Sequence, residues 1–270
     1  MNRVIEMLII LCLLALTSSC FGKSWINVEG FLKHVSIGRA GVWGVDSEDR
    51  IYYREGTYEA PMEKGTKWTL VPGLLKQLDV GTDIVVGVNH KDEIFYRKNI
   101  TGEHPTGSDW VKLNGHLKHV TVSPHGAIWG VKHENSIWFR NDISLHKPGG
   151  TGWQKVDGSL TQISAGLAGV WGVNANDEIF YRGRTYGGHI TVGSGWVQLL
   201  GKLAYISSGS GVVLGQRKDK NNFLRTEIRE GNPTGYDWRW LVQGLDVIEE
   251  YGGAIWGVSG GQYIWMSHTN

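Results

Sequence analysis

The sequence predicts an all-β protein, a six-bladed β-propeller with four antiparallel strands per blade and a ring closed by the N-terminal strand. One observation is a repeat whose leading tryptophans are spaced 43, 42, 43, 43 and 42 residues apart. These tryptophans are Trp25, Trp68, Trp110, Trp153, Trp196 and Trp238. The other observation is that each repeat holds four short strand-like runs separated by turn residues. Repeats of about 40–45 residues with four strands each are typical of propeller blades.

The N-terminus precedes the repeats and has a different character. Met7–Leu16 is an uninterrupted apolar run of ten residues, preceded by one positive charge and followed by small residues. This pattern predicts a secretory signal peptide over residues 1–20, cut near Ser19 or Cys20 and too short to span a membrane. A lipid-anchor site at Cys20 fits the preceding residues poorly. Residues 21–270 are then the propeller, and the expected location is secreted and extracellular.

The fourth repeat shows the expected strands most clearly. Leu160–Ser164 alternates apolar and polar residues, Gly169–Val173 is a short apolar run, and Glu178–Arg182 is aromatic and β-branched. A loop over 183–195, rich in Gly and Thr, separates these from Trp196–Leu199. Period-two patterns of this length, bounded by turn residues, are typical of an antiparallel sheet.

The phase of the repeat predicts how the ring closes. The first repeat segment is the tryptophan strand Trp25–Val28, and the last is the aromatic strand Tyr263–Met266, with no tryptophan strand after it. We expect these two segments to pair, because pairing removes two open sheet edges. The only cysteines are Cys12 and Cys20, so the mature chain has no internal disulfide to seal the ring.

Three repeated positions have roles that the pattern indicates. A glycine occurs at one strand position in all six repeats, where glycine usually marks close backbone approach. Aromatic or aliphatic residues precede it, which favours packing between blades. An arginine ends the third strand of five repeats and could stabilise loops or donate to a ligand; we favour the structural role. The glycines are Gly44, Gly87, Gly130, Gly172, Gly215 and Gly257, the preceding residues Trp43, Val86, Trp129, Trp171, Leu214 and Trp256, and the arginines Arg54, Arg97, Arg140, Arg182 and Arg225.

Polar residues align in the turns between the second and third strands of the repeats. Asn and Asp favour such turns because their side chains bond to nearby backbone groups. The alternative role is contact with a hydroxylated ligand, and the carbohydrate-binding candidates are Asp46, Asp49, Asn89, Asp92, Asn174 and Asp177. Asp46, Glu48 and Asp49 form the most acidic turn and are weak candidates for Ca²⁺, since they lack the spacing of a calcium loop. Asn99-Ile100-Thr101 is an N-glycosylation sequon.

Several function classes are disfavoured by the sequence. The formal net charge of +1 gives no bulk attraction to nucleic acid or to an anionic membrane. The G-x-S-x-G match at residues 257–261 falls in a repeat turn and not in the strand-to-helix turn of a hydrolase. His34 and His119 align in two repeats without clustered ligands for zinc. The repeats show no central cluster of His, Asp and Glu, so we expect no enzyme.

The repeated residues W-x-x-V-x-G-x-L-x-x-I-S-x-G-x-x-G-V-W-G-V-N-x-x-D-x-I-F-Y-R resemble the tectonin repeat. The chain from Trp25 onward is similar to the fish-egg lectins and the tectonin-type tachylectins. This resemblance implies a six-bladed propeller that binds N-acetylglucosamine or bacterial lipopolysaccharide, a role in defence, and in some relatives bound calcium. The secreted relatives carry disulfides, which this chain cannot form internally.

A lectin is therefore the first functional hypothesis. Repeated blades offer several weak sites, and engaging two or more on one surface raises avidity by roughly 10²–10⁴. The second hypothesis is a secreted propeller that binds a protein and no sugar. Both hypotheses allow a homo-oligomer.

Overall fold

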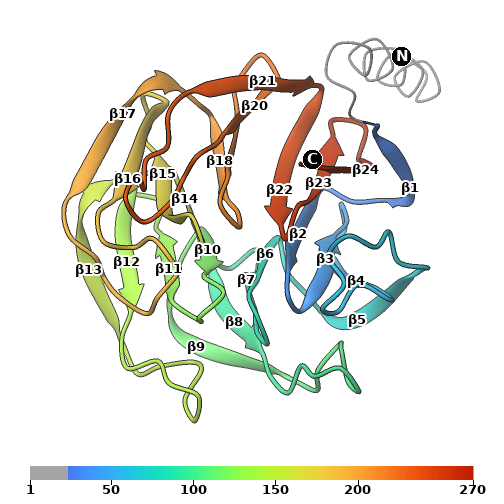
Figure 1. Ribbon diagram of the computed structural model, residues 1–270. Coiled ribbons are helices and arrows are strands. Elements are labelled where there is room, and N and C mark those ends of the chain that lie inside the picture. Colours follow the sequence, from blue (N-terminus) through green and yellow to red (C-terminus); the bar gives the residue numbers. More distant parts are fainter. Residues whose placement is uncertain (1–23, 270) are drawn as a thin grey trace.

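A computed structural model describes residues 24–269, which form six four-stranded antiparallel sheets arranged in a ring (Figure 1). The predicted all-β, six-bladed propeller is confirmed, since every regular element of this part of the chain is a strand. Within it we find no helix with the length and apolar character needed to cross a membrane. The predicted signal peptide and both cysteines lie outside the described residues.

The first two strands of each blade lie nearest the axis of the ring. The innermost strands are β2 (His34–Gly38), β6 (Gln77–Val80), β10 (His119–Val122), β14 (Gln162–Gly166), β18 (Tyr205–Ser208) and β22 (Leu245–Tyr251). The second strands are β3 (Gly41–Val45), β7 (Val85–Val88), β11 (Ile128–Val131), β15 (Gly169–Val173), β19 (Val213–Gln216) and β23 (Ala254–Ser259).

The third and fourth strands complete each blade toward the rim. The third strands are β4 (Arg50–Arg54), β8 (Glu93–Arg97), β12 (Ser136–Arg140), β16 (Glu178–Arg182), β20 (Asn221–Arg225) and β24 (Tyr263–His268). The outer strands are β5 (Trp68–Leu74), β9 (Trp110–His116), β13 (Trp153–Ser159), β17 (Trp196–Lys202), β21 (Trp238–Gln243) and β1 (Ile26–Phe31). We number the blades 1 to 6 from β2–β5 to β22–β24, and β1 belongs to blade 6.

The ring closes by the predicted strand exchange. The N-terminal strand β1 lies beside β24 in Figure 1 and forms the outer strand of blade 6. Its register pairs Ile26 with Met266 and Val28 with Ile264, as expected from the phase of the repeat. Val28 is fully buried in a cluster shared by blades 6 and 1, so the closure also completes a hydrophobic core.

The repeated glycine makes room for a leucine that precedes or begins the innermost strand of its blade. A Cβ at Gly44 would lie 2.4 Å from Leu32 Cδ1 and 2.9 Å from the carbonyl oxygen of His34. The same collision would occur in every blade, with leucine Cδ1 atoms 2.3–2.7 Å away. Those leucines are Leu32, Leu75, Leu117, Leu160, Leu203 and Leu245. Close approach therefore explains why glycine recurs there.

The residues before these glycines form the core between blades, as predicted. Trp43, Trp129, Trp171 and Trp256 are fully buried, and so are the aliphatic replacements Val86 and Leu214. Where the next strand offers an aromatic partner, the rings tilt against each other, as Trp43 does with Tyr53 at 5.3 Å between centroids. Such tilted contacts are favourable beyond the apolar area that they bury.

The five repeated arginines have the structural role that we favoured. The Arg54 guanidinium donates to the backbone oxygen of Lys64 at 2.9 Å and to the Glu29 carboxylate at 2.6 Å. It also lies 5.4 Å from the centroid of the Trp68 ring, a cation–π contact. Its four counterparts each donate to a loop carbonyl and lie over the tryptophan of their outer strand. The arginines thus hold the long loops against the rim.

Candidate functional site

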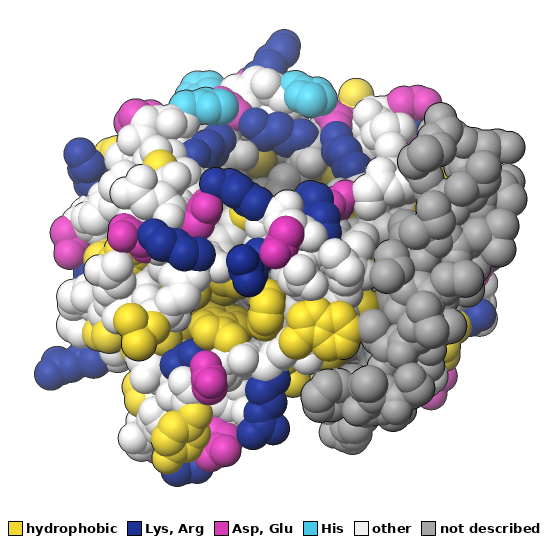
Figure 2. Space-filling model, turned by 90° about the horizontal axis from the view of Figure 1, so that it is seen from above, with side chains coloured by type: hydrophobic (Ala, Val, Ile, Leu, Met, Phe, Trp, Pro, Cys, Tyr) yellow, Lys and Arg dark blue, Asp and Glu magenta, His cyan; other side chains and the backbone are white. Residues whose placement is uncertain are grey.

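The predicted polar residues gather at one end of the propeller, which we call the turn face. It carries the turns between second and third strands, at residues 46–49, 89–92, 132–135, 174–177, 217–220 and 259–262, and the connections between blades. The opposite end, the loop face, carries the long loops between third and outer strands. On the side of the molecule shown in Figure 2, basic and acidic side chains are intermingled, with hydrophobic side chains gathered between them.

Turn chemistry accounts for much of the polar pattern. Oδ1 of Asp46 accepts the backbone N–H groups of Glu48 at 3.0 Å and Arg50 at 2.9 Å. Asn89 and Asn174 accept the corresponding two N–H groups in their own turns. The residues that end these turns have positive φ, and they are Asp49 (67°), Asp92 (61°), Asn135 (64°) and Asp177 (62°). Asn and Asp tolerate this left-handed conformation better than most residues.

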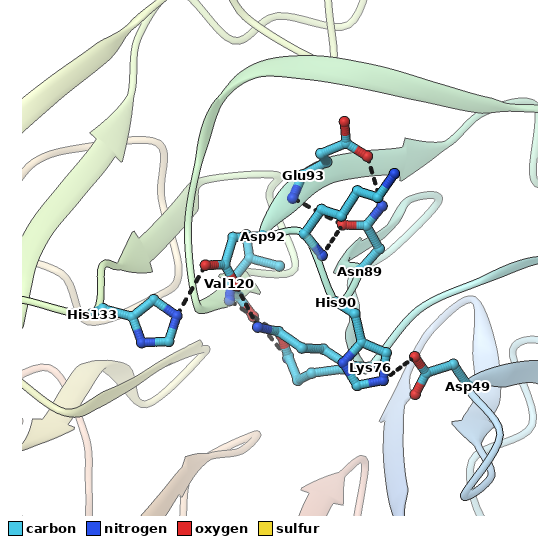
Figure 3. A network of polar contacts seen from close by, with 10 residues as sticks. Asp49, Lys76, Asn89, His90, Asp92, Glu93, Val120 and His133 are labelled. Atoms are coloured by element: carbon cyan, nitrogen blue, oxygen red, sulfur yellow. Dashed lines mark hydrogen bonds and ion pairs between the residues drawn. The ribbon is translucent and has the colours of Figure 1, made fainter.

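Three of the candidate carboxylates also link neighbouring blades, and Figure 3 shows two of them, Asp49 and Asp92. Asp49 forms an ion pair with Lys33 and also contacts His90, whose Nε2 lies 2.6 Å away in the next blade. Asp92 pairs with Lys76 and with His133, again one blade further, at 2.9 Å. Asp177 pairs with Lys218 at 2.7 Å.

The environment of Asp92 shows how these links act on a carboxylate. Partial burial raises its pKa, but the Lys76 ammonium and the His133 ring outweigh that effect, so the net pKa lies below the usual range. The carboxylate is therefore held in its charged form by its partners. Asp49 and Asp92 serve first to join blades.

A groove lies between blades 6 and 1, and we call it groove 6/1. It has a volume of about 320 Å³, which suits a small ligand. The side chains most relevant to a ligand are Asp46, Ser47, Arg50, Tyr52, Trp68 and Gln262. Phe31 also lines the groove, so three aromatic rings share one recess with two opposite charges, an amide and the Ser47 hydroxyl.

The groove is shaped by close packing at the rim. Gly30 has a φ of 106° and lets Trp68 approach, since a Cβ there would lie 3.2 Å from Trp68 Cδ1. The Trp68 indole N–H donates to the backbone oxygen of Glu29 at 2.8 Å, which latches blade 1 to the outer strand of blade 6. This fixes the indole at the edge of the recess.

The polar groups of groove 6/1 orient one another. Arg50 Nε donates to Asp46 Oδ2 at 2.7 Å, and the Tyr52 hydroxyl donates to the same oxygen at 3.3 Å. Burial raises the pKa of Asp46, but the hydrogen bonds from Arg50 and the backbone outweigh it and hold that pKa below its usual value. Burial and the nearby Asp46 charge raise the pKa of Tyr52. The groove therefore presents a fixed anion and a fixed cation side by side.

A second groove lies between blades 4 and 5, which we call groove 4/5. It consists of two adjoining hollows of about 320 and 220 Å³ that share Lys202, Leu203 and Arg217. Asp177 lines the smaller hollow. Of the six carbohydrate candidates, Asp46 thus lies in groove 6/1 and Asp177 in groove 4/5. Asp49, Asn89, Asp92 and Asn174 line neither.

Sequence reasoning gave Arg and Tyr at strand ends only as second-choice sugar contacts, and it did not single out Arg50, Tyr52 or Trp68 of groove 6/1. Tyr52 aligns with Phe95, Trp138, Phe180, Phe223 and Trp265 on the third strands. Side chains alternate between the two faces of a strand, so Tyr52 lies on the face opposite to the buried Ile51 and Tyr53. This alternation could have identified Tyr52 as a residue that faces a groove. Trp68 was recognised only as a repeat marker.

The predicted calcium set fits a calcium ion poorly. The Asp46 carboxylate already accepts four donors, and Asp49 lies between Lys33 and His90. Glu48 faces Arg50 at 3.4 Å. No group of three or more His, Cys, Asp or Glu suited to a metal occurs within residues 24–269.

The centre of the ring differs from expectation. We expected no central His, Asp and Glu cluster, yet His34, Asp79, His119 and Glu249 line the channel together with Tyr205. They come from the innermost strands of different blades, so no single repeat displays the set. The free volume there is only about 10 Å³, roughly that of one water molecule.

The channel groups are held mostly in their neutral forms. Burial and the neighbouring Asp79 charge raise the pKa of Glu249 to about 8, and the Tyr205 and Ser207 hydroxyls donate to its carboxylate. Burial lowers the pKa of His34 to about 4 and that of His119 to about 3. His34 Nε2 lies 2.8 Å from the backbone oxygen of Leu78, to which it donates as the neutral ring. The channel is thus a packed polar core.

Together, the ring of blades and the grooves between them define a binding propeller, of a lectin-like or a protein-interaction kind. Residues 15–58 and 55–260 match the Tectonin domain family model, and the chain belongs to that family. No match was found among curated proteins.

Solved structures with a similar fold are distant in sequence. Human WBSCR16 is 11% identical with a TM-score of 0.55, covering 88% of this chain and 72% of that one. The structure described as Kap60 bound to yeast RCC1 (Prp20) is 9% identical with a TM-score of 0.57, covering 88% and 80%. The structure described as YCF48 bound to D1 peptide is 13% identical with a TM-score of 0.54, covering 88% and 79%. These likenesses concern the fold alone.

Proposed function

We propose that this protein is a lectin and that groove 6/1 binds a sugar. The observation that carries the proposal is the joint placement of Tyr52 and Trp68 with Asp46, Arg50 and Gln262 in one recess. A pyranose ring presents apolar C–H groups on its faces and hydroxyls around its edge. The aromatic side chains suit the faces, while the Arg50 guanidinium and the Gln262 amide suit the hydroxyls, and Asp46 holds Arg50 in place.

The ligand class that we propose is N-acetylglucosamine, free or within bacterial surface glycans such as lipopolysaccharide. This choice rests on the tectonin family and on the mixed character of the groove. A single site with a dissociation constant near 1 mM contributes only about −4 kcal/mol. Two or more occupied grooves on a dense glycan would raise avidity by roughly 10²–10⁴, which suits defence against microbial surfaces.

We also propose that the protein acts outside the cell, as the N-terminal sequence indicates. The sequon is compatible with this, because Asn99 lies exposed in the loop between β8 and β9. Its side-chain amide donates to the Ser108 hydroxyl at 3.0 Å and is accessible for glycosylation. We propose no enzymatic activity, since the acidic and imidazole groups of the channel have about 10 Å³ of free space between them.

Retention on N-acetylglucosamine resin tests this proposal. We expect retention of the wild type and elution by free sugar, with a chelation arm that reports any calcium requirement. Tyr52→Ala should weaken binding at groove 6/1 by roughly tenfold, about 1.4 kcal/mol. Tyr236→Ala removes the same side chain from an exposed site on the loop face and should change nothing. Equal retention of both variants would remove groove 6/1 from the proposal.

The alternative is a protein-binding propeller. Leu70 and Leu74 are 57% and 61% exposed on the outer strand of blade 1, where they could contact a protein. A solved propeller of similar fold is described as bound to a peptide. Absence of retention on both N-acetylglucosamine and lipopolysaccharide would favour this alternative.

A further inference from the structure

Groove 4/5 is built from the same strand positions as groove 6/1. Phe223 takes the place of Tyr52, Trp238 that of Trp68, and Leu203 that of Leu32. The larger hollow has the same volume, about 320 Å³. The aromatic and apolar framework of a sugar site is therefore present a second time.

The polar lining of the two grooves differs in charge. Arg217 stands where groove 6/1 has Asp46, Lys218 where it has Ser47, and Lys202 where it has Phe31. The cations of groove 4/5 outnumber its carboxylates, Asp177 and Asp219, by three to two. In groove 6/1 one carboxylate faces one guanidinium.

The cation of greatest interest is Arg217. Its guanidinium makes one side-chain contact, an ion pair 3.6 Å from Asp219, and its side chain is 53% exposed. Asp219 is itself engaged by the backbone N–H of Asn221 at 3.1 Å. By contrast, Arg50 in groove 6/1 donates to Asp46 at 2.7 Å. Arg217 thus keeps most of its donors for a ligand.

The Trp238 ring of the same groove lacks the hydrogen bond that fixes its counterparts to the neighbouring blade. In four blades the outer-strand tryptophan donates its indole N–H to a backbone oxygen of the preceding blade, at 2.6–2.9 Å. The buried Nε1 of Trp238 has no such partner. A Cβ on Gly201 would lie 3.8 Å from the nearest atom of the Trp238 ring. In the four blades whose tryptophan makes this hydrogen bond, the corresponding distance is 3.0–3.2 Å. The Trp238 indole therefore lies further from the neighbouring strand.

We propose that groove 4/5 binds a hexose that carries an anionic group, a carboxylate or a phosphate. This rests on the proposed lectin function and adds a second specificity to it. The sugar ring packs against Phe223 and Trp238. Arg217 binds the anionic group, assisted by Lys202, through charge-assisted hydrogen bonds.

The test compares sugars that differ only in the anionic group. Methyl β-D-glucuronide is titrated beside methyl β-D-glucoside, and glucose 6-phosphate beside glucose, with binding followed by calorimetry. We expect the wild type to bind at least one anionic sugar about tenfold more tightly than its neutral partner, the effect of a charged hydrogen bond. The preference should shrink as salt is raised. The two pairs show whether carboxylate or phosphate is the preferred group.

The variants locate the site. Two other repeats have asparagine at the repeat position of Arg217, Asn89 and Asn174. The turn should therefore fold normally in Arg217→Asn. This substitution should remove the anionic preference, while Trp238→Phe should weaken both sugars equally. Arg229→Asn makes the same charge change at a side chain 62% exposed on the loop face, and should leave binding unchanged.

The outcomes separate this inference from the lectin proposal. Equal binding of the anionic and neutral sugars by the wild type, or an unchanged preference in Arg217→Asn, would overturn the inference. N-acetylglucosamine binding lost with Tyr52→Ala would meanwhile uphold groove 6/1. Anionic binding without N-acetylglucosamine binding would uphold groove 4/5 and remove the proposal for groove 6/1.

Discussion

Glu249 lies within the channel, with hydroxyl donors from Tyr205 and Ser207 and a pKa raised to about 8 by burial and the Asp79 charge. Between the ordinary value of 4.5 and 8, the folded protein keeps a proton that the unfolded chain releases. Raising the pH through this window therefore favours unfolding, by up to about 1.4 kcal/mol per pH unit. Above pH 8 this loss is complete.

Glu249→Gln should remove that pH dependence. We expect the free energy of unfolding of the variant, relative to wild type, to improve steadily from pH 5 to pH 8. Urea unfolding at each pH measures it. His34 and His119 have lowered pKa values, so their protonation destabilises both proteins equally as the pH falls below about 6.5. Parallel pH profiles for the two proteins would contradict the assignment.

Asp46 titrates in the opposite sense. Its lowered pKa means that its stabilising contacts with Arg50 are complete above the ordinary value of 3.8 and are lost as the pH falls through the lower folded value. Sugar binding in groove 6/1 should therefore stay constant from pH 7 down to about 5. Titration of N-acetylglucosamine at pH 5, 6 and 7 measures this. A loss of binding already at pH 6 would show that another group controls the site.

At the scale of elements, strand β1 determines whether the ring is closed. Removing residues 24–31 would expose the edge of β24 and open the cluster around Val28. We expect the shortened protein to associate through that edge and to lose its single sharp unfolding transition. Size-exclusion chromatography and thermal melting measure both effects.

A point variant in the same strand provides the control for that deletion. Ile26 is 41% exposed, and Ile26→Ser should change the free energy of unfolding by no more than about 0.5 kcal/mol. A shortened protein that remains monomeric and melts like the wild type would show that β1 does not hold the ring.

The elements were predictable because the repeat spacing and the period-two pattern act within one blade. The same reasoning gave the pairing of β1 with β24, since only the phase of the repeat was needed. The grooves were harder to predict, because Gly30 and Trp68 belong to different blades and meet only when the ring closes. The channel was missed because its acidic groups come from separate blades: Asp79 and Glu249 occupy the same repeat position in blades 2 and 6, and the other four blades carry Ser or Thr there.

Over the whole molecule, the repeated contact between neighbouring blades forms similar grooves whose lining residues differ. Groove 6/1 pairs Asp46 with Arg50, whereas groove 4/5 has Arg217 at the matching position. A propeller of this kind gains affinity from the number of grooves that one surface occupies. We expect binding to a dense glycan surface that carries both N-acetylglucosamine and an anionic sugar to exceed binding to free N-acetylglucosamine by roughly 10²-fold or more. Surface plasmon resonance at high and low ligand density measures the ratio, and a ratio near one would indicate a single working groove.

The most direct test of the central claim is retention of the protein on N-acetylglucosamine resin, for wild type, Tyr52→Ala and Tyr236→Ala in parallel. The lectin account predicts that wild type and Tyr236→Ala are retained and eluted by free sugar, while Tyr52→Ala elutes earlier. No retention of the wild type on this resin or on lipopolysaccharide would contradict the account and leave a protein-binding propeller.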